Sequence, residues 1–531
     1  MACMSQSLFT VSLYETLGPD TTEYIINHSA LPCVVTSLSH IPVLLKLKPR
    51  LPTLKVIISL DPLTNNDHPS LTKKALLEEL AADLGVKIYE ITDVEALGDS
   101  FGNPVYRPPA PSDIATINYT SGTTGNPKGV VLSHAAAIAG TSCSIIGILP
   151  QVNDVYISYL PLAHIYERLT EQGALWCGVA IGYFHGNILE LVDDMKILRP
   201  TGFVSVPRLL NRFAGAITAA TTAQPGVKGT LSRHIVDTKL ANLKDPESPS
   251  ATTQHAFYDR IWGRKVASAI GLQRARVIVS GSAPIDPNIQ NFLRVVLGNR
   301  LMQGYGLTET YAIALAQQPG DLSTGNCGGV VPACEICLMD VPDMDYLSTD
   351  KPQPRGELLV RGHMLLTEYY KNPEETQKAL LPNGWFRTGD IATVDSRGRF
   401  AIIDRVKNVL KLAQGEYISP ERIENVYLGQ LGYLAQAYVH GDSTETFLVA
   451  CFGVMPDLFA PFASKVLGRT LLATDLQAVA AACKDQRVRK AVCRDLDRVG
   501  RKSKFKGYER VRNCALFVDP FTVDNELLTP T

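Results

Sequence analysis

The sequence predicts an α/β protein in which parallel sheets are flanked by helices, followed by a small α+β unit. From residue 9 onward, short runs rich in β-branched residues alternate with helical runs. Strand, helix and strand repeated in this order are typical of a parallel sheet covered on both faces. Beyond about residue 404 the pattern changes to a helix, two strands and a long helical stretch. We therefore expect a large domain over 1–404 and a smaller one over 405–531.

The predicted elements follow one another along the large domain. Helices are expected at 20–30, 40–48 and 71–85, and the spacing of Asp20 and Glu23 is typical of a capping box. The apolar stretch 129–150 contains several polar side chains, which favours a buried helix over a membrane span. Strands are predicted in TVSLY, PCVVTS, KVIISL, VKIYEI, IATINY, GVVLS, GFVSV and ARVIVSGS.

The small domain has a different order of elements. A helix is predicted at 423–431, strands at 435–441 and 446–455, and one helical stretch at 476–500. Helices and strands are thus grouped rather than alternating, as in an α+β fold.

Charge and cysteine content argue against several classes of function. The chain has 51 Lys plus Arg and 52 Asp plus Glu, a formal net charge of -1, so we expect no nucleic-acid partner. Eleven scattered cysteines fit a reducing compartment better than a disulfide framework. Cys334 and Cys337 lie in a predicted strand, where residues three apart face opposite sides, which argues against a zinc site.

Targeting signals are not evident at either end of the sequence. The first residues lack the basic and apolar regions of a signal peptide, and LLTPT at the C-terminus is not an SKL-type address. We expect an intracellular protein without a transmembrane segment, cytoplasmic by default. A peroxisomal or membrane-associated location is also compatible with the sequence.

A glycine-rich loop between two predicted strands gives the first functional signal. The stretch Tyr119–Gly129 reads YTSGTTGNPKG. Backbone N–H groups near Gly122 and Gly125 can surround phosphate oxygens, with Lys128 supplying charge. The loop is not a Walker A motif, because proline precedes this lysine and glycine follows it. Its hydroxyl groups belong to Thr120, Ser121, Thr123 and Thr124.

Five motifs in the same order resemble the adenylate-forming (AMP-binding) superfamily. Within it, LPLAHIYER, VPRLLNRF and KLAQGEYISPERIE are most similar to the long-chain fatty-acyl-CoA synthetases, and the resemblance covers nearly the whole chain. The motifs are YTSGTTGNPKG, YLPLAHIYER, QGYGLTET, GWFRTGD and IDRVKNVLKLAQGEYISPERIE.

The resemblance implies a two-step reaction with ATP, Mg²⁺ and CoA. A medium- or long-chain fatty acid, or a polyketide-like acid, attacks the α-phosphate of ATP, and the resulting acyl-AMP then reacts with the CoA thiol. Such chemistry depends mainly on positioning and on neutralising phosphate charge. Transfer of the acyl group to a carrier-protein thiol is an alternative second step.

Roles for individual residues follow from the same resemblance. Thr120, Ser121, Gly122, Thr123, Thr124, Gly125 and Lys128 would hold the phosphates. Gly304 and Tyr305 would lie against the adenine, Thr308 would reach the α-phosphate, and Glu309 with Thr123 would hold Mg²⁺. Asp390 and Arg405 would bind the ribose, Lys411 would add to the ATP site, and His164 would lie near the acyl carboxylate. The implied catalytic residues are Lys128, Thr308, Glu309 and His164.

The small domain is expected to rotate between the two steps. Lys407 matches the hinge position, and Gly415 with Glu416 lie on the segment implied to serve the CoA step. A rotation allows one cavity to serve two reactions that need different groups.

Both ends depart from the family pattern. Long-chain members have further strands before TVSLYETLGP and a terminal lysine motif after PFTVDNELLTPT. The first subdomain is therefore expected to be incomplete, so that a partner or a missing N-terminal segment would cover it. Without the terminal lysine, adenylation is expected to be slow. A noncatalytic or fragmentary relative that binds nucleotide or acyl chain is the alternative to a working ligase.

Overall fold

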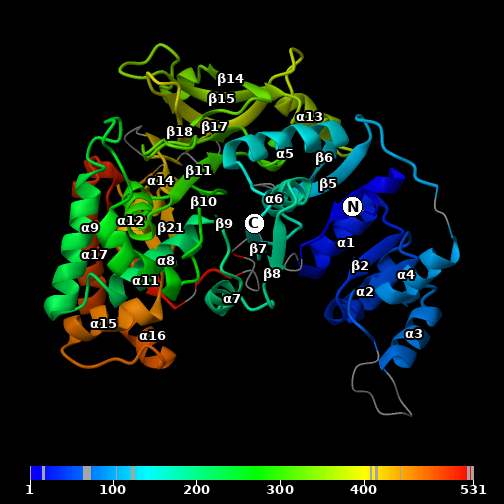
Figure 1. Ribbon diagram of the computed structural model, residues 1–531, viewed down its shortest axis with the longest axis horizontal. Helices are drawn as coiled ribbons and strands as arrows, with labels where there is room; N and C mark the ends of the chain where they lie inside the picture. Colours follow the sequence, from blue (N-terminus) through cyan, green and yellow to red (C-terminus); the bar gives the residue numbers. More distant parts are fainter. Residues whose placement is uncertain are drawn as a thin grey trace. The chain divides into compact units, whose positions relative to one another are not determined.

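The computed structural model describes residues 2–14, 18–63, 73–102, 105–120, 126–406, 410–412, 417–442, 444–518, 520–522 and 527. The chain divides into two compact units, drawn together in Figure 1. The first comprises Met1–His134, Thr367–Asn372 and Val523–Thr531, and the second comprises Ala135–Leu366 and Pro373–Thr522.

A mixed sheet in the first unit frames the glycine-rich loop. Its strand order is β1-β5-β6-β16, with β1 (Thr10–Ser12), β5 (Ile114–Thr120), β6 (Lys128–Ser133) and β16 (Glu368–Tyr369). Strands β5 and β6 run antiparallel, and Thr120 lies opposite Lys128. The segment 121–127 therefore begins and ends at neighbouring strand ends, as the sequence predicts.

A parallel sheet with its own core forms the rest of the first unit. It contains β2 (Cys33–Thr36), β3 (Val56–Ser59) and β4 (Lys87–Glu90). Helices α2 (Ile41–Leu47), α3 (Lys73–Asp83) and α4 (Ile91–Ser100) lie around it (Figure 1). Buried residues such as Ile26, Ile57 and Ile88 join the sheet to the helices.

The first helix begins earlier than expected. Helix α1 spans Gly18–Ser29, so Asp20 lies in its first turn. The interpretation of Asp20 and Glu23 as a capping box at the helix start is therefore wrong. Glu23 forms an ion pair of 3.0 Å with Arg50 instead.

The second unit contains the long sheet predicted from the alternating pattern. Its order is β13-β12-β11-β10-β9-β7-β8, and the strands from β11 to β8 are parallel. Because parallel strands end at the same edge, the segments that follow β10 and β11 leave the sheet together. The bounds are β7 (Val155–Ser158), β8 (Ala180–Tyr183), β9 (Gly202–Ser205), β10 (Val277–Ser280), β11 (Arg300–Tyr305), β12 (Leu315–Ala316) and β13 (Gly329–Val330).

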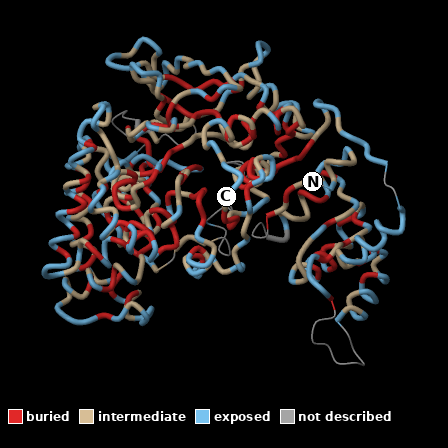
Figure 2. Tube along the Cα trace, viewed as in Figure 1, coloured by how far each residue is buried: buried red, intermediate tan, exposed pale blue. Residues whose placement is uncertain are grey.

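Helices bury the apolar residues of this sheet. Phe203 on β9 stacks against Phe213 of a helix, and both belong to a cluster that includes Leu293 and Val296. Figure 2 shows buried residues following the strands and the inner faces of the helices. The helices are α5 (His134–Ile148), α6 (Ile165–Trp176), α7 (Leu191–Leu198), α8 (Pro207–Ala220), α9 (Gly226–Ala241), α10 (Ala256–Tyr258), α11 (Arg264–Ala269) and α12 (Pro287–Leu297).

The predicted buried helix at 129–150 is shorter than expected. Its first residues form β6, and α5 begins at His134. Among the described residues, none of the helices combines the length and the apolar character that crossing a bilayer needs.

An antiparallel sheet carries the GWFRTGD motif. Strands β14 (Cys334–Met339), β15 (Arg355–Gly362), β17 (Phe386–Val394) and β18 (Phe400–Arg405) pair in that order. Helix α13 (Pro373–Ala379) precedes β17, and Asp390 lies opposite Arg405 in the β17–β18 register. The predicted strand that holds Cys334 and Cys337 is confirmed.

The C-terminal part of the second unit has its own hydrophobic cluster, formed by residues between Leu412 and Leu516. Strands β21 (Leu434–His440), β22 (Leu448–Val454) and β23 (Val511–Phe517) form its sheet, and β19 (Leu410–Lys411) pairs with β20 (Tyr417–Ile418). The helices are α14 (Pro420–Gln430), α15 (Pro456–Leu467), α16 (Leu476–Lys484) and α17 (Gln486–Lys502).

The helical part expected at 476–500 is confirmed, and it consists of two helices. Asp485 separates them, because its backbone is extended and its side chain accepts a hydrogen bond from the N–H of Arg487. Helix α15, which contains Pro461, and strand β23 were not predicted from the sequence.

Candidate functional site

The stem of the glycine-rich loop is tightly packed. Lys128 places its Nζ 5.3 Å from the ring centre of Tyr369. At Gly129, an added Cβ would lie 3.0 Å from Ile117, 3.1 Å from Tyr119 and 3.2 Å from Tyr370. Only a residue without a side chain fits there without displacing a neighbour. Ser121, Gly122, Thr123, Thr124 and Gly125 lie outside the described residues.

An aromatic cluster supports the start of this stem. The hydroxyl of Tyr119 lies 2.7 Å from Nδ1 of His28, and Tyr24 stacks on the same imidazole with ring centres 5.1 Å apart. Burial lowers the pKa of His28, and the adjacent Lys371 acts in the same direction. His28 is therefore neutral at physiological pH, and it anchors β5 to α1.

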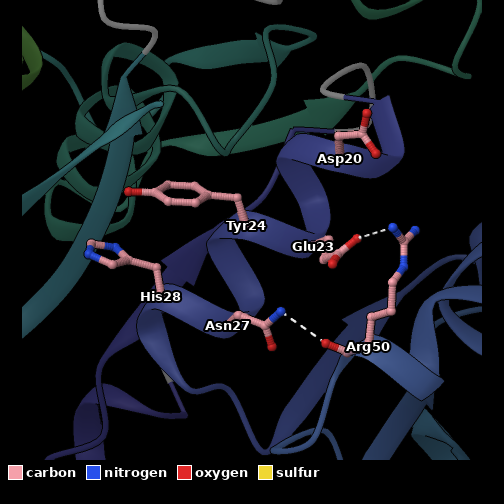
Figure 3. Close-up of a pocket in the computed structure, with 6 residues that line it drawn as sticks. All are labelled: Asp20, Glu23, Tyr24, Asn27, His28 and Arg50. Carbon is pink, nitrogen blue, oxygen red and sulfur yellow. Dashed lines mark hydrogen bonds and ion pairs between the residues drawn. The ribbon is translucent and has the colours of Figure 1, made fainter. Parts of the chain in front are cut away.

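Helix α1 presents a second group of side chains next to this cluster. Figure 3 shows Glu23 and Asn27 turned toward Arg50, with Tyr24 and His28 on the opposite side. The Nδ2 of Asn27 donates to the carbonyl oxygen of Arg50 over 3.0 Å. With Asp20, these residues line a shallow hollow, which contains none of the residues implied by the resemblance.

Two residues from separate strands, Tyr305 and Arg405, contact the carboxylate of Asp390. The hydroxyl of Tyr305, at the end of β11, donates to Oδ2 over 2.6 Å, and Nε of Arg405 donates to Oδ1 over 2.8 Å. The Asp390 side chain is 6% exposed and that of Arg405 is 41% exposed, so a polar ligand can reach the guanidinium from solvent. Burial raises the pKa of Asp390, whereas Arg405 opposes this shift.

Hydrogen bonds to the neighbouring strand β15 fix the turn that presents Asp390. Gly389 has a φ of +73°, a conformation that favours glycine, and its N–H donates to Glu357 over 3.2 Å. Arg387 donates from Nη2 to the same carboxylate over 2.6 Å, and the hydroxyl of Thr388 donates to the carbonyl of Leu358 over 2.7 Å. The backbone at Asp390 is therefore fixed before any ligand arrives.

Glu357 has a structural role at the site that sequence reasoning missed. It is 2% exposed on β15 and lies thirty residues before Arg387. A lone glutamate between apolar residues in GELLV was the available signal, because a buried carboxylate needs a partner.

The QGYGLTET motif forms a compact turn at the end of β11. Thr308 and Glu309 lie in a short 3-10 helix, and Leu307 donates its N–H to Oγ1 of Thr310 over 2.9 Å. Tyr311 follows with a φ of +48°, is fully buried, and donates from its hydroxyl to Gln172 over 2.7 Å. A strained residue held by deep packing fixes the direction of the turn.

The described residues offer few protein ligands for Mg²⁺. Within the described part of the chain, no group of three or more His, Cys, Asp or Glu side chains is arranged to hold a metal ion. Mg²⁺ commonly takes one or two carboxylates and fills its other positions with water and substrate phosphates. Glu309 as the main protein ligand fits such a phosphate-dependent site.

His164 caps the start of α6. Its Nδ1 accepts the backbone N–H of Tyr166 over 3.1 Å, and burial lowers its pKa. In a neutral imidazole whose Nδ1 is an acceptor, Nε2 carries the hydrogen. His164 can therefore donate a hydrogen bond from Nε2 to an oxygen such as that of a carboxylate.

Glu167, on the same helix, is another buried carboxylate. It is 2% exposed, and burial raises its pKa to about 8, with the nearby Glu171 acting in the same direction. The hydroxyl of Ser158 donates to Glu171 over 2.8 Å. Glu167 is thus mostly protonated at neutral pH.

The structure therefore brings Tyr305, Asp390 and Arg405 into one cluster, and places Gly304, Thr308 and Glu309 on the same strand end or the turn after it. Thr120 and Lys128 face each other in the first unit. Lys407, Gly415 and Glu416 lie outside the described residues. Lys411 is part of β19, but its side chain is not described.

Comparisons with known proteins agree with one another. A family model described as AMP-binding enzyme matches residues 1–370. The chain is 62% identical over 531 residues to "Acyl-CoA ligase 891, peroxisomal" of Penicillium roqueforti. This alignment covers all of this chain and 75% of the relative. The chain is 40% identical over 530 residues to "Long chain acyl-CoA synthetase 7, peroxisomal" of Arabidopsis thaliana, again covering all of this chain and 72% of the relative.

Solved structures share the fold. The adenylation domain of a carboxylate reductase from Mycobacterium chelonae superposes with a TM-score of 0.78 at 22% identity, over 99% of this chain and 74% of that one. The corresponding domain from Segniliparus rugosus was solved in complex with AMP and a co-purified carboxylic acid. It superposes with a TM-score of 0.76 at 24% identity, over 99% of this chain and 76% of that one. At these identities the likeness shows the architecture alone.

Proposed function

We propose that this chain, which belongs to the family of AMP-binding enzymes, is an ATP-dependent ligase that joins a long-chain fatty acid to CoA. The observation that carries the proposal is 62% identity along the full chain to an acyl-CoA ligase, together with 40% identity to a long-chain acyl-CoA synthetase. Both similarities span all of this chain, so they include the region of every candidate motif.

The reaction has two displacements. A carboxylate oxygen attacks the α-phosphorus of ATP, the bond to the bridging oxygen breaks, and pyrophosphate leaves. The CoA sulfur then attacks the acyl carbon, the carbon–oxygen bond to AMP breaks, and AMP leaves. When bound, Mg²⁺ neutralises charge on the phosphate oxygens.

The cluster around Asp390 is proposed to hold the nucleoside. The carboxylate accepts ribose hydroxyl protons, and Arg405 donates from its exposed side while its Nε stays on Asp390. Tyr305 and Gly304 form the surface for the adenine. Each Asp390 oxygen has a second lone pair, so the ligand does not have to displace Tyr305 or Arg405.

The remaining implied residues are proposed to act on the phosphates and the carboxylate. Lys128, the loop from Thr120 to Gly125 and Thr308 hold phosphate oxygens, Lys411 adds a charge to the ATP site, and Glu309 with Thr123 holds the metal ion. His164 donates from Nε2 to the acyl carboxylate, a role supported by its helix cap and lowered pKa.

A moving C-terminal domain is proposed for the second step. Its boundary at residues 404 and 405 is supported by the separate hydrophobic cluster from Leu412 to Leu516. Lys407 serves as the hinge, and Gly415 and Glu416 act in the CoA step.

The acceptor and location are proposed from the relatives. Their names specify CoA rather than a carrier-protein thiol, and two of them specify the peroxisome. Similarity along all of this chain favours a working ligase over a noncatalytic relative. Imaging of a tagged chain in a fungal cell, beside a peroxisomal marker, tests the location.

The proposal is tested by product formation with purified protein. The chain is incubated with ATP, Mg²⁺ and palmitate, with and without CoA, and AMP and palmitoyl-CoA are measured by chromatography. We expect stoichiometric AMP and thioester, and a loss of about 10²-fold or more in Lys128→Ala and in Glu309→Ala, because each removes a charge beside the reacting phosphates.

Lys244→Ala, at an exposed lysine outside the site, is the matched control and should keep full activity. Thioester formation that is unaffected by Lys128→Ala and Glu309→Ala would contradict the proposed residue roles. A folded, ATP-binding protein that forms no thioester from fatty acids of any length would contradict the proposed function.

A further inference from the structure

Two cysteines far from the proposed nucleotide residues in sequence lie side by side. Cys493 on α17 and Cys514 on β23 place their sulfur atoms 3.6 Å apart. Both elements belong to the C-terminal hydrophobic cluster, to which Val492 and Leu496 of the same helix also contribute. The thiols therefore face each other on packed elements.

The two thiols differ in environment. Cys514 is 5% exposed, and its pKa is raised by the contact with Cys493 and by burial. Cys493 is only partly buried, and its pKa is lowered because Cys514 hydrogen-bonds to it and Arg489 adds positive charge one turn earlier on the helix. A partly buried cysteine that favours the thiolate, next to a more deeply buried thiol, matches the division between a reactive and a resolving cysteine.

We propose that Cys493 and Cys514 form a reversible disulfide when the protein meets hydrogen peroxide. The Cys493 thiolate attacks one peroxide oxygen, the O–O bond breaks, and the departing hydroxide takes up a proton to give water and a sulfenic acid. The sulfur of Cys514 then attacks the Cys493 sulfur, the S–O bond breaks, and a second water leaves. In total, two thiols are oxidised and one peroxide is reduced to two waters.

The required movement is small. A disulfide has its sulfur atoms about 2.05 Å apart, so the pair must close by about 1.6 Å, which side-chain rotation and a small helix shift can supply. The bond would join α17 to β23 across the core of the C-terminal part. A cross-link of this kind stabilises a fold by restricting the unfolded chain.

Two other cysteines in the C-terminal part, Cys451 and Cys483, are the alternative partners for a disulfide. Cys451 on β22 lies opposite Ala515, the residue next to Cys514 in β23. Cys483 on α16 is buried, and burial raises its pKa to about 11. We expect neither to be part of the disulfide. Among the described contacts, the sulfur of Cys514 lies against that of Cys493, and the pKa of Cys493 is lowered, so this thiol reacts first.

The test uses the reduced full chain and one to a few equivalents of hydrogen peroxide. Remaining thiols are alkylated, the protein is digested without reductant, and peptides are identified by mass spectrometry. We expect a Cys493–Cys514 cross-link that disappears on treatment with dithiothreitol. Cross-links through Cys451, or oxidation of Cys493 beyond the disulfide without a cross-link, would overturn the proposal.

Thermal unfolding provides a second readout. The oxidised wild-type chain should unfold at a temperature several degrees above the reduced chain, a difference that Cys493→Ser abolishes. Cys483→Ser is the matched control, and it should show the same oxidation-dependent shift as the wild type. An equal shift in Cys493→Ser and wild type would contradict the assignment. The cross-link itself is measured on the wild type, so this conclusion does not depend on the variants folding.

Discussion

The two regions proposed to hold ATP are built in different ways. In the loop stem, where Thr120 faces Lys128, side chains pack closely around Gly129, and the side chain of Tyr119 is held by a hydrogen bond with His28. The cluster at Asp390 is held by hydrogen bonds and charge, with Tyr305 and Arg405 on its two oxygens.

This difference predicts different responses to substitution. Packing determines whether the loop stem forms, so changes there should appear first in the stability of the fold. Charge and hydrogen bonds at Asp390 face a ligand, so changes there should appear first in the affinity for ATP. Asp390→Ala, Gly129→Ala and two hydroxyl deletions can break or sharpen this contrast, and Glu167→Gln adds a buried carboxylate outside both regions.

Asp390→Ala should have the largest effect on nucleotide binding. It removes the proposed ribose acceptor and leaves Tyr305 and Arg405 without their partner. We expect the KM for ATP to rise about 10- to 100-fold, since hydrogen bonds to charged groups contribute about 1.5–3 kcal/mol. Steady-state kinetics with varied ATP measures the effect. Asp395→Asn, at the turn of the same hairpin, is the control and should leave the KM within about twofold of the wild type.

Glu167→Gln tests a buried carboxylate that lies beside a second carboxylate instead of a cation. The folded pKa of Glu167 is about 8 against an ordinary value of 4.5, so between these pH values the unfolded chain loses a proton that the folded chain keeps. Wild-type stability should therefore fall with rising pH by up to about 1.4 kcal/mol per pH unit from this group.

Glutamine does not ionise, so the stability of the variant relative to the wild type increases as pH rises. Urea midpoints at pH 5.5 and pH 8.5 measure this difference, which should favour the variant more at the higher pH. An advantage that is the same at both pH values would show that Glu167 is ionised in the folded protein.

Gly129→Ala tests the packing of the stem. The new methyl group would press against Ile117, Tyr119 and Tyr370 at 3.0–3.2 Å. We expect the free energy of unfolding to fall by about 1–3 kcal/mol, as for other overpacked sites. Gly98→Ala in α4 is the control, because no atom lies within 4 Å of its added Cβ and alanine favours a helix. Equal stability changes in the two variants would argue against a close-packed stem.

Two matched hydroxyl deletions should have the smallest effects and compare the regions directly. Tyr305→Phe should raise the KM for ATP about three- to tenfold, since Asp390 loses one of the two hydrogen-bond donors that orient its carboxylate. Tyr119→Phe should lower stability by about 1 kcal/mol and leave the KM nearly unchanged. Kinetics and urea unfolding on both variants give the comparison. The reverse pattern would mean that the stem rather than the cluster controls nucleotide affinity.

Sequence reasoning predicted the elements that depend on local pattern. The alternation of strands and helices, the strands on both sides of the glycine-rich loop and the strand of Cys334 are confirmed. The motifs also indicated Tyr305, Asp390 and Arg405, which the fold brings together. The hydrogen bond from Tyr305 to Asp390 was not predicted, because it joins residues 85 positions apart.

Other features needed the three-dimensional fold. His28 supports Tyr119 across 91 positions, and Glu357 holds Arg387 across thirty, so neither pairing has a local signature. Helix α15 was missed because Pro461 is a residue expected to end a helix. Asp20 was placed at a helix start because its spacing to Glu23 fits a cap, yet α1 begins two residues earlier.

The central claim is that the acid is activated as an acyl-adenylate before CoA reacts, and transfer of ¹⁸O tests it most directly. Palmitate labelled with ¹⁸O in both carboxylate oxygens is incubated with ATP, Mg²⁺, CoA and the purified chain, and the products are analysed by mass spectrometry. Because the carboxylate oxygen bonds to the α-phosphorus and remains there when the thioester forms, one ¹⁸O should appear in each AMP. Label in pyrophosphate or inorganic phosphate, or AMP without label, would contradict the account.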